Sequence, residues 1–196
     1  MRLDPLVESD LPDLATLLVE PAVYSSGYVM HRQPNSLADA LALARQRTFA
    51  ADPPNGVGFG RIAFTVRLTT DSPLGEAGTV VGTSSLGDAH LANESIHLGW
   101  TLYGPRWWGT KVNPEAKYLL LRHCFEDLGC VRVEFKTDSL NERSRAALLR
   151  IGAVEEGTFR NHMICPGPRL RHSVYFSVID SDWPAVKRQL EDKLAR

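Results

Sequence analysis

Apolar residues recur at helical spacing in two segments near the start of the chain. In Asp10–Leu18 and Ser36–Ala50, leucine and alanine return every three or four positions, which is the period of one helix face. The aspartate and the serine that open these segments favour the N-cap of a helix, because their side chains accept hydrogen bonds from free first-turn amides. The pattern therefore predicts two early helices.

Three apolar stretches of strand-like composition follow, and the turn-forming sequences DSPLGEAG and DAHLANES separate them. Short strands joined by such turns are typical of an antiparallel meander. The predicted strands are Ile62–Leu68, Thr79–Leu86 and Ile96–Tyr103.

The run DPPNGVGFG before the first of these strands is rich in turn formers. Its residues Gly56, Gly58 and Gly60 lack the spacing of a dinucleotide-binding fingerprint, and no strand precedes them. A turn is therefore the favoured interpretation.

The second half of the chain alternates strands with helices. Asn113 and Pro114 open the strongest helical pattern, and Gly129 ends it. Asparagine as a cap, proline in the first turn and glycine after the last turn are the positions these residues favour. The remaining predicted elements are a strand at Val131–Thr137, a helix from the cap Asn141 to Ile151, a hairpin of Glu155–Ile164 and Ser173–Ile179 around CPGPRLR, and a helix at Trp183–Ala195.

Length and composition fit one globular domain that spans residues 1–196. A chain of 196 residues can bury one sizeable core. Its 43% of hydrophobic and 23% of charged residues lie near the average of globular domains. A net charge of -1 gives no field that would concentrate a nucleic acid or an anionic membrane at the surface, so we expect neither as a partner.

The first residues, MRLDPLVESDLPDL, contain acids and a proline where a signal peptide needs a basic end and an apolar run. No window holds 18 apolar residues, as a membrane-spanning helix would need, and we expect a cytoplasmic protein. Cys124, Cys130 and Cys165 show no C-x-x-C spacing, so the sequence signals neither a disulfide framework nor a metal site. Cys124 is interpreted as a core residue.

The segment Arg106–Asn113 connects a predicted strand to a predicted helix. The first-turn amides of a helix are unpaired and its dipole is positive at that end, which attracts an anion. Gly109 allows a close approach of the backbone, while Arg106 and Lys111 add positive charge. The alternative is a turn that only starts a helix, with two solvated charges.

A nucleoside-triphosphate loop is a rival interpretation of the same segment. Residues Gly104 to Lys111 read G-x-x-x-x-G-T-K, which exchanges the last two positions of that motif. Lysine must directly follow the glycine to reach the terminal phosphates, and the next residue must meet magnesium. Trp107 and Trp108 would also crowd the cradle, so this interpretation is disfavoured.

The run RWWGTKVNPEAKYLLLRH, followed by RVEFKTDSLNERSRAALLRIGA and EEG, resembles the GNAT superfamily of N-acetyltransferases, specifically its branch of ribosomal-protein N-terminal acetyltransferases (RimJ/RimL-like). The match is dense from Leu98 to Gly157. The order of predicted elements agrees with the family over nearly the whole chain, although the first 60 residues carry no specific motif. The resemblance implies an α/β (α+β) GNAT fold. Its central sheet is mixed and mostly antiparallel, with about seven twisted strands that splay between the fourth and the fifth, and about four to five helices flank it.

The resemblance also implies acetyl-CoA as the cofactor, an amine as the acceptor and, from family habit, a homodimer. The loop Arg106–Asn113 would hold the pyrophosphate, and the pantetheine arm would lie between the splayed strands. Lys111 departs from the family pattern Q/R-x-x-G-x-G/A, where a second small residue is usual; its ammonium contacts a phosphate or the loop is wider. The implied cofactor-binding residues are Arg106, Trp108, Gly109, Thr110, Lys111, Val112, Asn113, Asn141 and Ser144.

Acetyl transfer needs a neutral amine, a polarised thioester carbonyl and a proton for the departing thiolate. Ser144 stands at the serine of the family's N-x-x-S, where its hydroxyl would donate to the thiolate, and Asn141 would contact the pantetheine arm. Both are also common residues at a helix start, so capping is the alternative role. The oxyanion would be bound by a backbone amide of the Ile96–Tyr103 strand.

The general base is open between three residues. Glu94 and His97 lie at the strand where members of the family often place a base, and related sequences tend to have glutamate at the position of His97. A histidine is partly neutral at pH 7, as a base must be. The alternatives are a half-exposed strand histidine for His97 and a loop residue for Glu94. His162 is the third candidate.

Tryptophans and arginines add two weaker expectations. Trp100 is interpreted as a core residue, and one of Trp107 and Trp108 as a wedge beneath the loop. Three arginines near the hairpin could receive an acidic peptide, although scattered surface arginines are the default; they are Arg160, Arg169 and Arg171.

The sequence thus predicts an acetyl-CoA-dependent N-acetyltransferase that acts by direct transfer in a ternary complex. A protein N-terminus is the favoured acceptor, because an α-amine with a pKa near 8 needs only a modest base. A small amine, such as an antibiotic or a polyamine, is the alternative acceptor. The alternative class is a non-catalytic module that binds acyl-CoA.

Overall fold

One seven-stranded sheet runs through the molecule in the order β1-β2-β3-β4-β5-β7-β6. The computed structural model describes residues 1–25, 31–49, 59–165 and 169–196. The strands are β1 (Arg2–Pro5), β2 (Phe59–Arg67), β3 (Val80–His90), β4 (Ser95–Tyr103), β5 (Arg132–Asp138), β6 (Val154–Ile164) and β7 (Leu170–Ile179).

The sheet is mixed and mostly antiparallel, as the sequence predicts. The strands β2, β3 and β4 form the expected antiparallel meander, and β6 and β7 form the expected hairpin. The neighbours β4 and β5 run parallel and pair only from Ser95 with Arg132 to His97 with Glu134. Beyond that pair the two strands diverge, which confirms the predicted splay.

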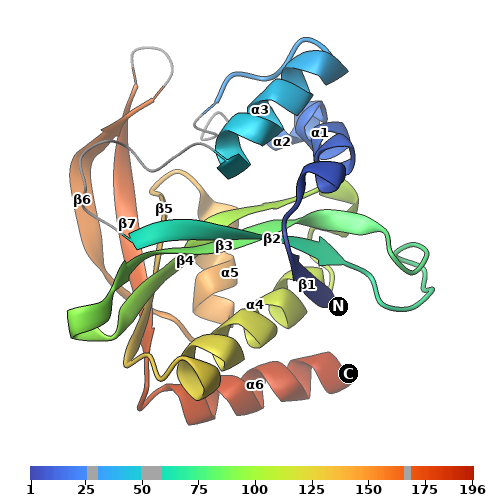
Figure 1. Ribbon diagram of the computed structural model, residues 1–196. Coiled ribbons are helices and arrows are strands. Elements are labelled where there is room, and N and C mark those ends of the chain that lie inside the picture. Colours follow the sequence, from blue (N-terminus) through green and yellow to red (C-terminus); the bar gives the residue numbers. More distant parts are fainter. Residues whose placement is uncertain (26–30, 50–58, 166–168) are drawn as a thin grey trace.

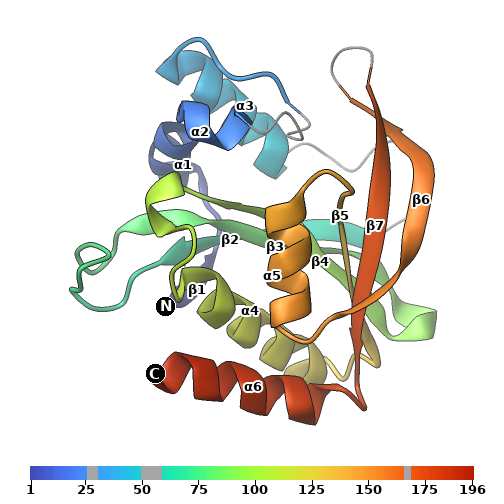
Figure 2. The ribbon, with the colours of Figure 1, turned by 180° about the vertical axis from the view of Figure 1, so that it is seen from behind.

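Six α-helices flank the sheet in the described residues, against the four to five expected. They are α1 (Leu11–Leu18), α2 (Pro21–Tyr24), α3 (Leu37–Phe49), α4 (Val112–Arg122), α5 (Glu142–Arg150) and α6 (Trp183–Ala195). Figure 1 shows α1 to α3 on one face of the sheet, with α4 and α6 on the other. Figure 2 places α5 beside α4 on that second face.

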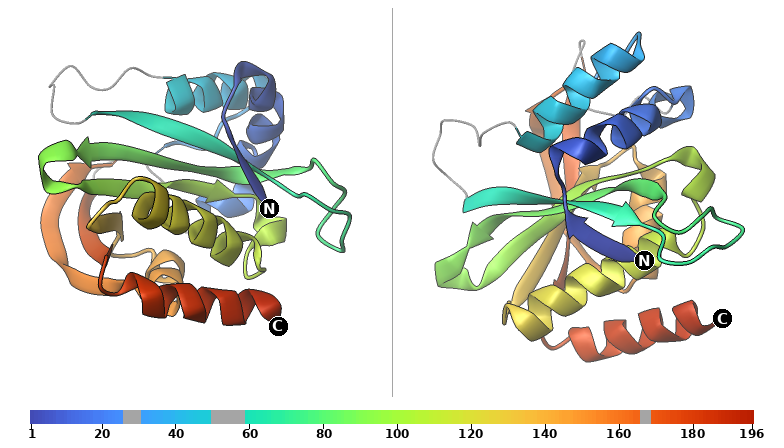
Figure 3. Two further views of the ribbon diagram at one scale, coloured as in Figure 1. Left: turned by 60° about the horizontal axis from the view of Figure 1, so that its bottom comes forward. Right: turned by 45° about the vertical axis from the view of Figure 1, so that its right-hand side comes forward.

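The core is divided between the two faces. One buried cluster joins α1 and α3 to strands β2 and β3 and reaches the start of α4. The other joins α4, α5 and α6 to strands β3, β4, β5 and β7, and the side chain of Cys124 is fully buried in it, as expected. The two further views in Figure 3 show the sheet between these helical layers. The sheet is thereby held from both sides around the point where β4 and β5 separate.

Two of the four predicted helix caps are confirmed. Ser36 caps α3, because its hydroxyl accepts from the Asp39 amide at 3.1 Å. Asn141 caps α5, because its side-chain oxygen accepts from the Ser144 amide at 2.9 Å. In both cases the local sequence alone determines the contact.

The other two predicted caps are wrong. Asp10 precedes α1, but its buried carboxylate accepts from Thr65 at 2.6 Å and pairs with Arg67. Asn113 lies inside α4 as its second residue. The hydroxyl of Thr110 accepts from the first amide of that helix at 3.3 Å, and α4 begins two residues earlier than predicted.

Smaller differences concern the shortest elements and the element ends. Strand β1 and helix α2 each have four residues, too few for a periodic pattern, and the sequence predicts neither. Helix α4 continues as a π-helical turn, His123–Asp127, before Gly129 ends it at φ +66°. The predicted turn of glycines lies outside the described residues except for Gly60, which is part of β2.

Candidate active site

The loop before α4 leaves backbone amides available to a ligand. A short 3-10 turn, Pro105–Trp107, leads from β4 into the loop. In the described part of the chain, the amides of Gly109, Lys111 and Asn113 have no hydrogen-bond acceptor. Three free donors at the positive end of a helix can bind an anion, and the predicted pyrophosphate site at this loop stays a prediction.

Glycine at position 109 is needed for backbone conformation, not for packing. Its φ is +76°, and a Cβ atom built on it would meet nothing within 4 Å. Side chains strain the backbone in this region, whereas glycine does not. The open space over Gly109 leaves room for a phosphate to approach the backbone.

The tryptophan pair anchors the loop from below. Trp107 is buried and its Nε1 donates to the Leu74 carbonyl at 3.0 Å, so Trp107 is the predicted wedge. The Nε1 of Trp108 donates to the Tyr103 carbonyl at 2.8 Å. The guanidinium carbon of Arg143, on α5, lies 3.5 Å from the centre of a Trp108 ring. This stack joins the loop to α5.

The side chains of the loop divide into engaged and exposed groups. The hydroxyl of Thr110 donates to the Trp107 carbonyl at 2.7 Å, and the Val112 side chain is fully buried in the core. Any contact of these two residues with the cofactor would come from the backbone or from the exposed part of Thr110, and it stays a prediction. Arg106 is exposed, with its guanidinium 5.8 Å from a Trp107 ring, and it adds positive charge beside the free amides.

Lys111, which departs from the family pattern, contacts the C-terminal helix. Its Nζ donates to the Leu194 carbonyl at 3.0 Å. A cation is favourable there because the last carbonyls of a helix carry partial negative charge. Lys111 therefore links the loop to α6 in this structure, a role that neither sequence-based alternative includes.

Ser144 lies in the first turn of α5, on the same side of the molecule as the loop. Its amide donates to Asn141, as described above, while its half-buried hydroxyl makes no hydrogen bond within the described residues. The hydroxyl is thus available as a donor. The oxygen of Asn141 is engaged as the cap, which leaves its amide group for a ligand.

His97 lies where β4 and β5 separate. Its side chain is only 2% exposed, so the alternative of a half-exposed strand histidine is wrong. Burial lowers the pKa of His97, and the carboxylate of Glu134, 3.7 Å from Nδ1, partly opposes this. The pKa of Glu134 is in turn lowered, chiefly by His97. A neutral imidazole beside an ionised carboxylate is therefore the state at neutral pH.

The family model for the acetyltransferase (GNAT) domain matches residues 1–154. The chain belongs to the GNAT acetyltransferase family. Members of this family use acetyl-CoA, and the splayed sheet and the loop before α4 are the places where the resemblance puts that cofactor. The fold, the family and the cofactor that the sequence predicts are thus confirmed.

Named relatives of this GNAT chain differ in their acceptors. It is 30% identical over 111 residues to the putative ribosomal N-acetyltransferase YdaF of Bacillus subtilis, covering 56% of this chain and 59% of that protein. The chain is 30% identical over 100 residues to the FsC-acetyl coenzyme A-N(2)-transacetylase of Aspergillus fumigatus, and the match covers 48% of this chain and 43% of that protein. The matches span about half the length of these curated relatives.

Solved structures of the family resemble the chain over almost its full length. A putative acetyltransferase from T. thermophilus is 33% identical, with a TM-score of 0.78, over 98% of this chain and 93% of that one. This likeness includes β7 and α6, which lie beyond the residues that the family model matches.

The two other candidate bases are exposed side chains. Glu94 is exposed in the turn before β4, with φ +47°, and the whole length of β4, roughly 30 Å for its nine residues, lies between Glu94 and the loop. This position matches the alternative of a loop residue. His162 is exposed on β6, and its Nδ1 lies 2.9 Å from the Ser173 hydroxyl. The role of either residue as the base stays a prediction.

Trp100 is not a core residue, contrary to the prediction. It is half-buried with φ +50°, at a bulge where β4 has one residue more than β3. Cations of Arg61 and Lys136 lie 5.0 and 5.8 Å from its ring, and the His97 ring meets it edge-on at 5.0 Å. The positive φ turns the strand at the splay, so the ring leaves the packed faces.

The hairpin arginines are mostly engaged within the protein. Arg169 forms an ion pair with the buried Asp138 at 2.8 Å. The Nε of Arg171 donates to the Ser173 hydroxyl at 2.9 Å, and burial lowers its pKa. Arg160 lines a surface hollow with Asn161 and His172. An acidic-peptide site at these arginines stays a prediction.

Lys117 is a buried lysine of α4 that the sequence patterns do not single out. Its side chain is 6% exposed and its Nζ donates to the Thr101 hydroxyl at 3.2 Å. A signal was present, because position 117 lies on the helix face that also carries Leu120 and Leu121, where an apolar residue is expected. Burial lowers the pKa of Lys117 to about 7.

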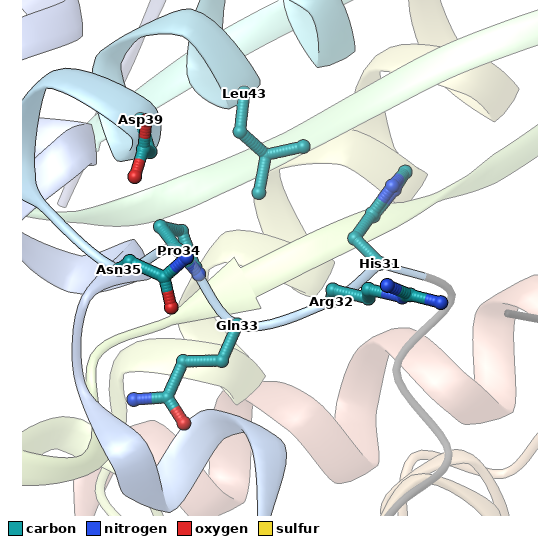
Figure 4. A pocket seen from close by; sticks show the side chains of 7 residues that line it. All are labelled: His31, Arg32, Gln33, Pro34, Asn35, Asp39 and Leu43. Carbon is teal, nitrogen blue, oxygen red and sulfur yellow. The ribbon is translucent and has the colours of Figure 1, made fainter.

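A separate polar pocket lies between the segment 31–35 and α3. Figure 4 shows its lining side chains, with Asp39 and Leu43 contributed by the helix. Its volume is about 530 Å³, and burial lowers the pKa of His31 within it. The pocket shares no residue with the cofactor loop or with α5.

Cysteines, metal ligands and membrane-spanning helices add no further site. All three cysteines are free thiols. The described residues contain no group of three or more histidine, cysteine or acidic side chains placed to hold a metal. None of the helices in these residues is both long and apolar enough to span a membrane.

Proposed function

We propose that the protein transfers the acetyl group of acetyl-CoA to the α-amine of a protein N-terminus. The observation that carries this choice is the buried, neutral His97 beside Glu134 at the point where β4 and β5 separate. An α-amine has a pKa near 8 and a lysine side chain one near 10.4. A base weaker than an ordinary histidine can deprotonate the first far more readily than the second.

Each step of the proposed reaction has a group to perform it. His97 takes a proton from the amine, directly or through water, and the amine nitrogen attacks the thioester carbonyl. The negative charge on that oxygen is met by a backbone amide of β4 beyond His97, where no pairing with β5 occupies the strand. Ser144 donates a proton to the departing thiolate and regains one from the attacking nitrogen as the amide forms, and coenzyme A leaves as a thiol.

Direct transfer in a ternary complex is supported by the state of the cysteines. Burial raises the pKa of the Cys124 thiol to about 12, and the pKa of Cys130 is also raised. Only a thiolate is an effective nucleophile. An acetyl-cysteine intermediate on either residue is therefore disfavoured, and intersecting lines in double-reciprocal initial-rate plots are the expected kinetic pattern.

The wider assignment follows from the same proposal. The RimJ/RimL-like branch is supported by the similarity to YdaF, whose name refers to the ribosome. We assign residues 1–196 to one domain, because β7 lies between β5 and β6 in a sheet continuous with β1. The three free thiols are consistent with a reducing compartment such as the cytoplasm. A homodimer is expected from family habit, and light scattering tests it.

The test is a thiol-release assay on matched acceptors with mass mapping of the products. One peptide carries a free α-amine, the second the same sequence with a blocked N-terminus and an internal lysine, and the third acceptor is a polyamine. We expect release only with the first peptide and acetylation at its α-amine. Faster transfer to the lysine peptide or to the polyamine would contradict the proposed acceptor.

Calorimetry with acetyl-CoA separates failure of the acceptor from failure of the enzyme. Micromolar binding without thiol release on any acceptor would indicate a non-catalytic acyl-CoA-binding module. An absence of binding would overturn the cofactor assignment as well.

A further inference from the structure

Lys117 is a buried lysine that carries its charge only in part at neutral pH, because its pKa is about 7. In the described part of the chain no carboxylate lies within ion-pair distance of its Nζ. Its polar contact is the Thr101 hydroxyl at 3.2 Å, and its Nζ lies 5.4 Å from the centre of the Phe135 ring. The titratable group that acts on the pKa of Lys117 is Cys124, in the π-helical turn after α4, and burial raises the pKa of that thiol.

Such a group is expensive for the fold. Burying an ammonium group without a paired charge costs on the order of several kcal/mol. A methionine of similar length would fill the same space without that cost. A costly polar group at an otherwise apolar position is a mark of a functional site.

The Nζ of Lys117 lies at the point where β4 and β5 separate. Thr101 belongs to β4 after the strand has left β5, and Phe135 is the first residue of β5 beyond the last β4–β5 pair, His97 with Glu134. Lys117 therefore touches both strands where they diverge. The same divergence is the place where a pantetheine arm, with its two amide groups, would enter the sheet.

We propose that Lys117 is a binding residue for the pantetheine arm, and that its Nζ donates a hydrogen bond to an amide carbonyl of that arm. The ammonium form has three N–H donors, of which Thr101 accepts one. The inference rests on the proposed use of acetyl-CoA and adds a contact that lies on the sheet, away from the pyrophosphate loop.

The test compares two ligands that differ by the arm. Coenzyme A contains it, whereas adenosine 3′,5′-bisphosphate has only the nucleotide end. For Lys117→Met we expect the Kd for coenzyme A to rise by about 10-fold to 100-fold, the range of a hydrogen bond to a charged group. The Kd for the bisphosphate should stay within about twofold of wild type, because that ligand does not reach the sheet.

The matched control is Lys187→Met, which removes a half-exposed lysine of α6 that pairs with Glu126 at 2.8 Å. It should leave both affinities unchanged. Equal weakening of both ligands by Lys117→Met, or no weakening of either, would overturn the arm contact. Equal affinity of the wild-type protein for coenzyme A and for the bisphosphate would also overturn the arm contact. If the wild-type protein binds neither ligand, the proposed function itself is overturned.

A measurement on the wild-type protein avoids dependence on the variant. With ¹⁵N-labelled lysine, the Nζ resonance of Lys117 should shift on titration with coenzyme A and stay in place with the bisphosphate. An Nζ resonance that responds alike to both ligands would contradict a contact with the arm.

Discussion

The guanidinium group of Arg143 stacks on the ring of Trp108, with the guanidinium carbon 3.5 Å from the ring centre. Arg143 belongs to the first turn of α5 and Trp108 to the loop before α4. The contact therefore joins the two helix starts that the sequence implicates in cofactor binding. It also places a positive charge against the loop of the predicted pyrophosphate site.

Replacement of Arg143 by alanine should weaken binding of coenzyme A by about threefold to tenfold, because a cation next to the anion site is lost. Arg143→Lys keeps the charge but loses the planar stack, so the affinity of this variant for coenzyme A should lie between those of wild type and of Arg143→Ala. Calorimetry with coenzyme A measures the affinity of both variants, and a second, higher salt concentration shows how much of the change is due to the charge. Wild-type affinity in the alanine variant would show that the stack serves stability alone.

Gly109 and Gly129 provide a matched pair for the approach of a phosphate. Both have positive φ, +76° and +66°, and a Cβ atom on either would meet no atom within 4 Å. Alanine at either position should lower the free energy of unfolding by about 1 kcal/mol through backbone strain. Only Gly109→Ala should also weaken the binding of coenzyme A, by at least about tenfold, because the methyl group of the alanine would occupy the space above the free amides. Equal affinity in the two variants would contradict a pyrophosphate at this loop.

Ser144→Ala tests the proton donor for the thiolate. The hydroxyl makes no hydrogen bond within the described residues, so its removal should leave stability nearly unchanged. If it acts mainly in the transition state, kcat should fall by about 100-fold while the Kd for acetyl-CoA stays the same. An unchanged kcat would return Ser144 to a purely structural role at the start of α5.

The buried Lys117 predicts a dependence of stability on pH. Its pKa is about 7 in the folded protein, against an ordinary value of 10.5. Between these values the unfolded chain binds more protons than the folded one, so this group makes stability rise with pH. Lys117→Met should therefore be more stable than wild type by about 1 to 4 kcal/mol at pH 6, and the difference should shrink as pH approaches 10.

Urea unfolding of both proteins from pH 6 to pH 10 measures this difference. A methionine variant that is less stable than wild type at pH 6 would show instead that favourable interactions hold the Lys117 ammonium in the fold.

Local signals explain most of what the sequence predicts correctly. The caps at Ser36 and Asn141 and the end at Gly129 depend on residues within one or two turns of each other. The loop Arg106–Asn113 is predictable for the same reason, since a helix start and nearby cations suffice to define an anion site.

The errors arise where residues distant in sequence decide the outcome. Asp10 is a good cap by its type, but Thr65 and Arg67, more than 50 residues away, take its carboxylate. The proximity of His97 to Glu134 follows from a parallel pairing that no local pattern encodes. The side-chain role of Lys111 likewise depends on the far end of the chain, at Leu194.

The most direct test of the cofactor site is a crystal structure of the protein with coenzyme A. We expect pyrophosphate oxygens within hydrogen-bond distance of the amides of Gly109, Lys111 and Asn113, with the arm between β4 and β5. A nucleotide bound elsewhere, with those amides free, would contradict a pyrophosphate site at this loop.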